Sequence, residues 1–291
     1  MSVLITGGAG ALGLELAHKL SRKRTRTRIF DLPNVDYDRV HSLKDVEIFE
    51  GDITIYSDVR DAVRGVDRVV HLAALLPPAS ELSEGRTQTV NVGGTENVVK
   101  ALRSENEEAV LVFASSVCVY GLPGSDEQYV SEEHALEATD YYSRSKIRCE
   151  QIIRKALKKY VIVRISGVTA TEFFELPEVL QFTADQRIEF VTRGDVADAI
   201  ISSMEHQEAW RLTMNIAGGE TWQMRGGDYI SRICDVMEIP SSNVTFAKKR
   251  NWFGWYDTAK ARATLDYRPI PFNQYLRDLR KSVRRAYGYE D

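Results

Sequence analysis

Tyr142 and Lys146 stand four residues apart in the segment Tyr142-Ser143-Arg144-Ser145-Lys146. On a helix, this spacing places the two side chains on the same face. A tyrosine with an ordinary pKa of about 10 is a poor base at neutral pH. A neighbouring ammonium group favours the phenolate, so we expect Lys146 to lower the pKa of Tyr142. The pair can form a proton-transfer site, although this spacing also occurs on helices by chance.

A glycine-rich turn near the N terminus suggests which ligand would lie beside the pair. The run Thr6-Gly7-Gly8-Ala9-Gly10-Ala11-Leu12-Gly13 contains G-x-G-x-x-G, follows the apolar stretch Val3-Leu4-Ile5 and opens a helical pattern. Glycines allow a tight turn and a close approach of the backbone to a pyrophosphate. The helix that follows presents its N–H groups and the positive end of its dipole to that group. The two motifs together predict a redox enzyme that binds a dinucleotide.

Asp31 is the next candidate, 18 residues beyond Gly13 and at the end of a predicted second strand. A carboxylate at this position accepts hydrogen bonds from the adenosine ribose and repels a 2′-phosphate. Asp31 therefore favours NAD over NADP. The basic cluster between Arg22 and Arg28 is the main observation against this choice, and we interpret most of it as a solvated loop.

The elements that must hold these residues alternate between strands and helices. Apolar runs predict strands, and apolar residues at helical spacing predict the helices between them. This order predicts an α/β fold with a doubly wound parallel (Rossmann) sheet and a smaller C-terminal substrate lobe. We assign residues 1–165 to the NAD-binding domain and 166–291 mainly to the substrate-binding lobe, with segments near 190–217 returning to the first domain. Predicted strands cover 3–6, 28–31, 46–49, 68–72, 110–113, 161–164 and 213–216, and predicted helices cover 11–20, 59–63, 89–104, 143–157, 196–204, 229–237 and 272–287.

The composition limits the class of protein. The 291 residues are 43% hydrophobic and 27% charged, which is ordinary for a globular protein. A net charge of −4 argues against a nucleic-acid partner for the whole molecule. The three cysteines have no metal-binding spacing, and no apolar run reaches the ~20 residues of a membrane span. We therefore expect a cytoplasmic protein with a small-molecule substrate, no metal, no nucleic acid and no membrane.

Taken together, the motifs resemble the extended short-chain dehydrogenase/reductase family, and within it the NAD-dependent epimerases and dehydratases typified by UDP-galactose 4-epimerase. The resemblance covers residues 1–165 strongly and the segments 195–199 and 255–261 more weakly. The motifs that carry it are Gly7-x-x-Gly10-x-x-Gly13, Asp31, Gly51-Asp52-Ile53, His71-Leu72-Ala73-Ala74, Asn91-Val92, Ser115-Ser116-x-x-x-Tyr120-Gly121 and Tyr142-x-x-x-Lys146.

The resemblance implies a role for each matching residue. Ser116 would hydrogen-bond the reacting oxygen, Tyr142 would be the acid/base, and Lys146 would support Tyr142 and hold the nicotinamide ribose. Asp52 and Ile53 would flank the adenine, and Ile165 and Val168 would lie near the nicotinamide. The remaining cofactor-binding residues implied by the family are Gly7, Gly10, Ala11, Leu12, Gly13, Asp31, Leu72, Ala73, Ala74 and Asn91.

The implied reaction oxidises a substrate hydroxyl to a ketone on NAD. Two departures from the family pattern bear on the substrate. Val117 and Cys118 occupy the place where 4,6-dehydratases carry acid/base groups, and Gly167 occupies the place of an asparagine found in many nucleotide-sugar epimerases. The segment 166–190 is atypical, and Arg187 and Arg250 are the weak candidates for contacts with a substrate pyrophosphate.

Three functions stay open at this stage. The first is an NAD-dependent sugar epimerase acting through a transient keto intermediate on a nucleotide sugar. The second is an NAD-dependent dehydrogenase or reductase of a smaller alcohol, polyol or hydroxy acid. The third is a non-catalytic NAD-sensing protein, although such proteins typically lose the tyrosine or the lysine. The resemblance also implies a homodimer built from the helix before the fifth strand and the helix that bears Tyr142.

Overall fold

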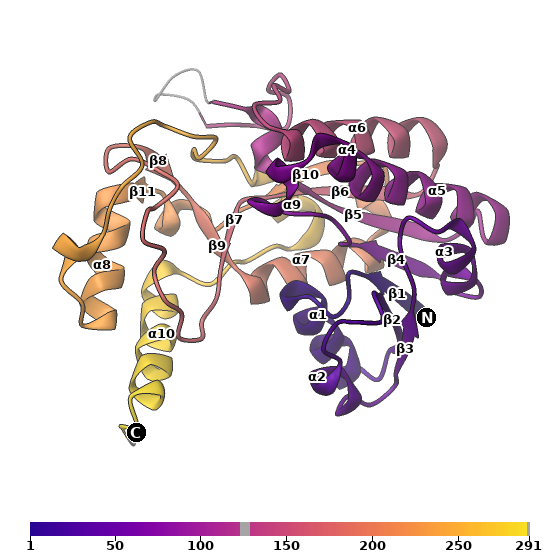
Figure 1. Ribbon diagram of the computed structural model, residues 1–291, viewed down its shortest axis with the longest axis horizontal. Helices are drawn as coiled ribbons and strands as arrows, with labels where there is room; N and C mark the ends of the chain where they lie inside the picture. Colours follow the sequence, from indigo (N-terminus) through magenta and orange to yellow (C-terminus); the bar gives the residue numbers. More distant parts are fainter. Residues whose placement is uncertain (123–128, 290–291) are drawn as a thin grey trace.

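A seven-stranded parallel sheet forms the centre of the molecule (Figure 1). The computed structural model describes residues 1–122 and 129–289. The strand order is β10-β6-β5-β4-β1-β2-β3, and every neighbouring pair is parallel. The predicted doubly wound parallel sheet is therefore confirmed. The strands are β1 (Ser2–Thr6), β2 (Arg26–Asp31), β3 (Val46–Glu50), β4 (Arg68–His71), β5 (Val110–Ser116), β6 (Tyr160–Ile165) and β10 (Thr213–Ile216).

Helices cover both faces of this sheet because successive side chains along each strand point to opposite faces. In β1, Val3 and Ile5 belong to one buried cluster and Leu4 belongs to the other. The first face is covered by α1 (Ala11–Arg22), α2 (Asp38–His41), α7 (Arg193–Glu205) and α9 (Ala259–Leu265). The second face is covered by α3 (Tyr56–Val63), α5 (Gly94–Glu105) and α6 (Tyr141–Ala156).

The order of the strands fixes where a ligand can bind. From β1 the chain winds outward to β2 and β3, then crosses back to β4 on the other side of β1. Ligands of such sheets bind in the crevice beyond the carboxyl ends of the strands at this reversal. The segment between β4 and α5 passes over this crevice and contains the short helices η1 (Ala79–Leu82) and α4 (Glu84–Thr87) and the π-helical turn η2 (Gln88–Gly93).

The C-terminal part forms a smaller lobe beside the sheet (Figure 1, orange and yellow). Its core gathers aromatic side chains such as Trp222, Phe253 and Tyr275. The lobe contains β7 (Gly167–Thr169), β8 (Arg187–Ile188), β9 (Phe190–Thr192), β11 (Met224–Arg225), α8 (Gly226–Met237) and α10 (Phe272–Ala286), with β7 paired to β9 and β8 to β11.

The chain crosses between the two parts more than once. After the smaller strands, α7 packs on the face covered by α1, and β10 pairs with β6 at the edge of the main sheet. The division of the chain at residue 165 stays a prediction. None of the helices in the described part of the chain is long and apolar enough to span a membrane.

Candidate functional site

A cavity of about 890 Å³ opens at the carboxyl ends of β1, β2, β4, β5 and β6. The glycine turn, Asp31 and Tyr142 all contribute to its lining. Most of the predicted site residues line this one cavity. They are Gly7, Gly10, Ala11, Leu12, Gly13, Asp31, Asp52, Ile53, Leu72, Ala73, Ala74, Ser116, Tyr142, Lys146, Ile165 and Val168.

The glycine turn is shaped by close backbone contacts. Gly7 has a φ of +70°, and a Cβ at this position would lie 2.8 Å from the backbone nitrogen of Ala73. A Cβ on Gly13 would lie 2.5 Å from the carbonyl oxygen of Gly8. Gly10 precedes α1 and has no side chain to cap it. The first N–H groups of α1 therefore face the cavity at a helix N terminus, which is a favourable place for a phosphate.

Asp31 lies at the end of β2 and turns its carboxylate toward the glycine turn. The backbone N–H of Ala9 donates to Oδ2 at 3.0 Å, and that of Leu32 donates to Oδ1 at 2.9 Å. Each carboxylate oxygen can accept a further hydrogen bond. Arg28, from the basic cluster, instead pairs with Glu47 and donates to the carbonyl oxygen of Ala62 at 2.6 Å. The carboxylate of Asp31 is thus fixed at the cavity wall with capacity for two ribose hydroxyls.

Tyr142 lies at the beginning of α6, where three side chains fix the helix terminus. Asp140 and Ser143 form a capping box, in which the Ser143 N–H donates to Asp140 Oδ1 at 2.6 Å. Glu81, from the loop over the cavity, accepts from the N–H of Tyr141 at 3.0 Å and from that of Tyr142 at 3.1 Å. A carboxylate at a helix N terminus is electrostatically favourable. These contacts hold the backbone that carries Tyr142.

Lys146 lies one turn further along α6 and is buried. Its Nζ donates to the carbonyl oxygen of Ala114 at 2.7 Å and lies 5.5 Å from the centroid of the Tyr142 ring. Burial lowers the pKa of Lys146 and raises the pKa of Tyr142 well above its usual value. The expected lowering of the Tyr142 pKa is therefore wrong, because burial desolvates the phenolate.

Ser116 and its neighbour Ser115 end β5, with separate hydrogen-bond partners. Ser116 lines the cavity, and its Oγ accepts from the N–H of Cys118 at 3.3 Å. Ser115 donates from Oγ to Glu150 Oε1 at 2.6 Å. The hydroxyl of Ser116 keeps its proton available for an oxygen in the cavity, because its observed bond uses an oxygen lone pair.

A buried ion pair lies behind this site. Arg164 on β6 donates from Nε and Nη2 to the two carboxylate oxygens of Glu150 on α6, at 3.0 and 2.7 Å. Both side chains are at most 3% exposed. Burial opposes the charge on Arg164, whereas the bond to Glu150 favours it, and the net effect raises the pKa of Arg164. The pair joins β6, the strand that ends at Ile165, to the helix that carries Lys146.

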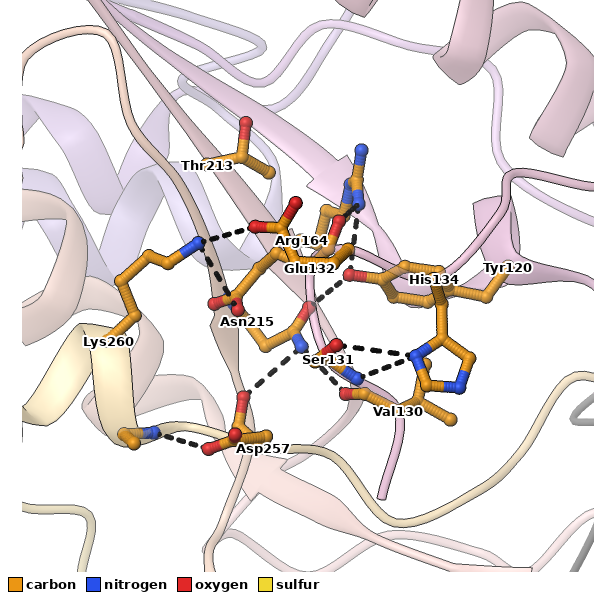
Figure 2. A network of polar contacts seen from close by, with 12 residues as sticks. Tyr120, Val130, Ser131, Glu132, His134, Arg164, Thr213, Asn215, Asp257 and Lys260 are labelled. Atoms are coloured by element: carbon orange, nitrogen blue, oxygen red, sulfur yellow. Dashed lines mark hydrogen bonds and ion pairs between the residues drawn. The ribbon is translucent and has the colours of Figure 1, made fainter. Parts of the chain in front are cut away.

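The Arg164 guanidinium also connects the sheet to a segment of the C-terminal half (Figure 2). Its Nη1 donates to Tyr120 Oη at 3.0 Å, and Tyr120 Oη donates to Asn215 Oδ1 at 2.6 Å. The N–H of Asn215 donates to Glu132, whose carboxylate lies 3.5 Å from Lys260 Nζ. This network anchors β10 and α9 to the part of the sheet that ends at the cavity.

Three predicted site residues do not line the cavity. Asn91 is buried and bonds through its amide to the N–H and carbonyl of Leu75 and to Ser145, so it holds the loop over the cavity. The guanidinium of Arg187 stacks on Trp255, 4.1 Å from the ring centroid. Arg250 pairs with Asp185 at 2.7 Å. The predicted substrate contacts of Arg187 and Arg250 receive no support from this placement.

Other cavity residues were missed in the sequence. Ser166 follows β6, is 4% exposed, and has a buried Oγ with no hydrogen-bond partner among the described residues. Arg193 begins α7, which covers the face of the sheet opposite to α6, and its side chain lines the cavity. Position directly after a strand was a usable signal for Ser166, but no spacing pointed to Arg193. The other missed residues are Phe30, Leu32, Gly51, Thr54, Arg86, Val90, Ala114, Ser115, Thr169 and Ala170.

The chemistry of the cavity walls fits a dinucleotide and a polar reacting group. In the part of the chain that the structure describes, no three His, Cys, Asp or Glu side chains gather where they could hold a metal ion. The geometry is that of a helix N terminus with glycines, a carboxylate at the end of β2, and a tyrosine that shares the cavity with a serine and a lysine.

Comparison with known proteins agrees with this geometry. The chain is 32% identical over 168 residues to N-acetyl-alpha-D-glucosaminyl-diphospho-ditrans,octacis-undecaprenol 4-epimerase of Escherichia coli O157:H7, covering 54% of this chain and 44% of that protein. It is 32% identical over 163 residues to a 3 beta-hydroxysteroid dehydrogenase/Delta 5→4-isomerase of Mycobacterium tuberculosis, covering 52% and 41%. The chain spans less than half the length of these curated relatives.

A solved structure extends the similarity of the fold to nearly the whole chain. UDP-glucuronic acid 4-epimerase from Bacillus cereus, in complex with NAD, matches with a TM-score of 0.80 and 20% identity, covering 99% of this chain and 100% of that one. Residues 3–174, which hold the glycine turn, Ser116, Tyr142 and Lys146, match the model of the NAD dependent epimerase/dehydratase family. The chain therefore belongs to this NAD-dependent enzyme family, a group of the extended short-chain dehydrogenases/reductases.

Proposed function

We propose that the protein is an NAD-dependent sugar epimerase that oxidises a substrate hydroxyl to a transient ketone and then reduces it on the other face. One observation carries the proposal: the glycine turn, Asp31, Ser116, Tyr142 and Lys146 line a single cavity. A dinucleotide extending from Asp31 past the turn brings its reactive end toward Tyr142. The family of the chain supports epimerisation as the first candidate.

Each residue has a defined part in the proposed reaction. Bound NAD supplies the hydride acceptor. Tyr142 Oη removes the proton from the substrate hydroxyl as the carbon loses its hydride, and later returns a proton to the same oxygen. Ser116 Oγ donates a hydrogen bond to that oxygen and holds the ketone in place. Lys146 supports the ionised form of Tyr142, and its bond to Ala114 keeps the ammonium at the end of β5.

A second candidate is an NAD-dependent dehydrogenase of a smaller alcohol, polyol or hydroxy acid. It is favoured by the placement of Arg187 and Arg250 outside the cavity lining, which leaves a nucleotide-sugar pyrophosphate without its expected partners. Leu75, Leu76 and Ala170 give part of the same cavity an apolar wall. The common first step in both candidates is the oxidation at Tyr142.

The fate of the cofactor tests the choice between them. An epimerase recycles NAD, so the enzyme with UDP-glucose or UDP-N-acetylglucosamine should form the C4 epimer with no net NADH. We expect epimer formation in a product assay by NMR while absorbance at 340 nm stays constant. Stoichiometric accumulation of NADH with a small alcohol would contradict the epimerase proposal and support the dehydrogenase. Failure of the protein to bind NAD would overturn both and leave neither a sensor nor an enzyme of this type.

Asp31→Ser should weaken the binding of NAD by about 10- to 100-fold, because two ribose hydroxyls lose a charged acceptor. Loss of the negative charge should also reduce the difference in binding affinity between NAD and NADP. Titration calorimetry with both dinucleotides measures this effect, and Asp36→Ser, in the exposed turn after β2, is the matched control. Tighter binding of NADP than of NAD by the unaltered protein would contradict the role of Asp31.

The association and location of the protein are also proposals. We infer a homodimer in which α5 and α6, which pack together on the second face of the sheet, meet their counterparts. A cytoplasmic location with a small-molecule substrate follows from the proposed activity. Size-exclusion chromatography with light scattering tests the dimer, and a monomer at micromolar concentration would contradict it.

A further inference from the structure

α1 packs against α7 on one face of the sheet, and the ion pairs between the two helices show how they are oriented. Lys19 pairs with Asp198 at 2.9 Å, and Lys23 pairs with Glu205 at 3.2 Å. Residues later in α1 thus meet residues later in α7. Both helices therefore begin at the same end of the sheet, so Arg193, the first residue of α7, is carried to the end of the cavity where α1 begins.

The side chain of Arg193 lines the same cavity as the first residues of α1. It is 19% exposed, and its Nη2 lies 3.2 Å from Oε2 of Glu172, a side chain that is 60% exposed. Asp195, two residues further, is engaged elsewhere: it accepts from Thr192 Oγ1 and from the N–H of Ile270. The guanidinium is therefore held at the cavity by an exposed carboxylate that can move away.

The distribution of charged side chains around the cavity indicates which part of a ligand the Arg193 guanidinium can bind. The carboxylates among the described lining residues are Asp31 and Asp52, both at the end where β2 and β3 finish. The cations are Arg86, Lys146 and Arg193. Lys146 donates to the carbonyl oxygen of Ala114 and is assigned to the support of Tyr142. Arg86 is exposed and lies on α4, which contacts α6 on the second face of the sheet. Arg193 is thus the cation carried by the helix that adjoins α1.

We propose that Arg193 binds the pyrophosphate of the dinucleotide, and that Glu172 occupies the guanidinium until the cofactor arrives. The inference rests on the proposed function, because it takes NAD as the ligand. A pyrophosphate at the beginning of α1 carries two negative charges, and a planar guanidinium can bind two of its oxygens. The exposed carboxylate of Glu172 forms a weak pair that a doubly charged ligand displaces.

This arrangement predicts opposite effects for the two partners. Arg193→Met should weaken NAD binding by about 10- to 100-fold, because a charge-assisted contact is lost. Arg193→Lys should recover part of the affinity, since it restores the charge without the fork of donors. Glu172→Gln should tighten NAD binding by up to about fivefold, because the pyrophosphate no longer competes for the guanidinium.

Titration calorimetry on the full chain tests the proposal with NAD, ADP-ribose and adenosine as probes. The Arg193→Met loss should appear with NAD and ADP-ribose and be absent with adenosine, which lacks the pyrophosphate. Arg268→Met, which breaks the exposed pair with Asp266 outside the cavity lining, is the matched control and should leave all three affinities unchanged. Thermal melting of each variant separates a binding defect from a folding defect.

The outcomes separate this inference from the proposed function. Unchanged NAD affinity in Arg193→Met, an equal loss with adenosine, or weaker NAD binding in Glu172→Gln would each overturn the role of Arg193. If Arg193→Met binds NAD normally but raises the KM of a substrate, the arginine belongs to the substrate end and the inference fails. If the unaltered protein binds none of the dinucleotide probes, the proposed function itself fails.

Discussion

Tyr142→Phe is expected to reduce turnover by about 10²- to 10⁴-fold, the usual contribution of a positioned acid/base group. The ring still fits its partly buried place at the beginning of α6, and Lys146 keeps its bond to Ala114. NAD affinity should therefore change little. Steady-state rates and titration calorimetry measure the two effects on the same preparation.

The pH dependence of the reaction gives a second readout of Tyr142. Burial raises the pKa of Tyr142 well above its usual value, which favours the protonated phenol at neutral pH. Alcohol oxidation needs the phenolate as proton acceptor, so its rate should rise as the pH increases. Ketone reduction begins from the phenol and should not show this rise. The Phe variant should lose the rising limb, because its ring has no proton to exchange.

Tyr141→Phe is the control for these measurements. Tyr141 precedes the catalytic candidate, and its ring lies against the Arg144 guanidinium at 5.8 Å. We expect this variant to retain the turnover and the pH profile of the unaltered protein. Retained turnover in Tyr142→Phe would contradict the assignment of Tyr142 as the acid/base.

Local sequence signals were sufficient for the fold and for one part of the site. The glycines, Asp31 and the tyrosine–lysine pair each follow a strand or begin a helix, so their place depends on nearby residues. The contact made by Glu81 could not be predicted from such local signals. Glu81 caps α6 across 60 residues of chain, from a loop over the cavity, and nothing around it in the sequence indicates that contact. Arg193 likewise reaches the cavity through the parallel packing of α7 on α1.

The pKa of Tyr142 could not be obtained from spacing alone. The interval of four residues correctly places Lys146 next to Tyr142, but it gives no information about burial. In the structure the ammonium is directed to the carbonyl of Ala114, and desolvation of the phenolate dominates. The irregular segment after β6 is a similar case, because short strands with distant partners, such as β8 with β11, lack a repeat long enough to show a period.

The polar network in Figure 2 explains how the irregular second half is held to the site. Asn215, at the sheet edge, accepts from Tyr120 and donates from its amide to the carbonyl oxygens of Val130 and Asp257. Tyr120 in turn accepts from Arg164. Arg164 thus links β6, α6 and this connection through its hydrogen bonds. Because Arg164 is buried, its charge must be balanced by a buried partner.

Glu150→Gln is expected to lower the free energy of unfolding by about 3–5 kcal/mol, because Arg164 would remain a buried charge without its counter-ion. The neutral amide also places a donor group against a guanidinium that offers only donors. Urea denaturation followed by circular dichroism measures the loss. Glu84→Gln, which breaks the exposed pair with Arg144 on the other side of α6, is the matched control and should cost about 0–1 kcal/mol.

The double variant Glu150→Met with Arg164→Met separates the cost of an unpaired charge from the loss of packing. Replacing both partners by apolar side chains removes the buried charge, so the double variant should be more stable than Glu150→Gln. It should nonetheless turn over more slowly than the unaltered protein, because Ser115, next to Ser116, loses its acceptor on α6. A Glu150→Gln variant that loses no more stability than Glu84→Gln would show that Arg164 is balanced by its other partners, Tyr120 and the carbonyl of Glu132.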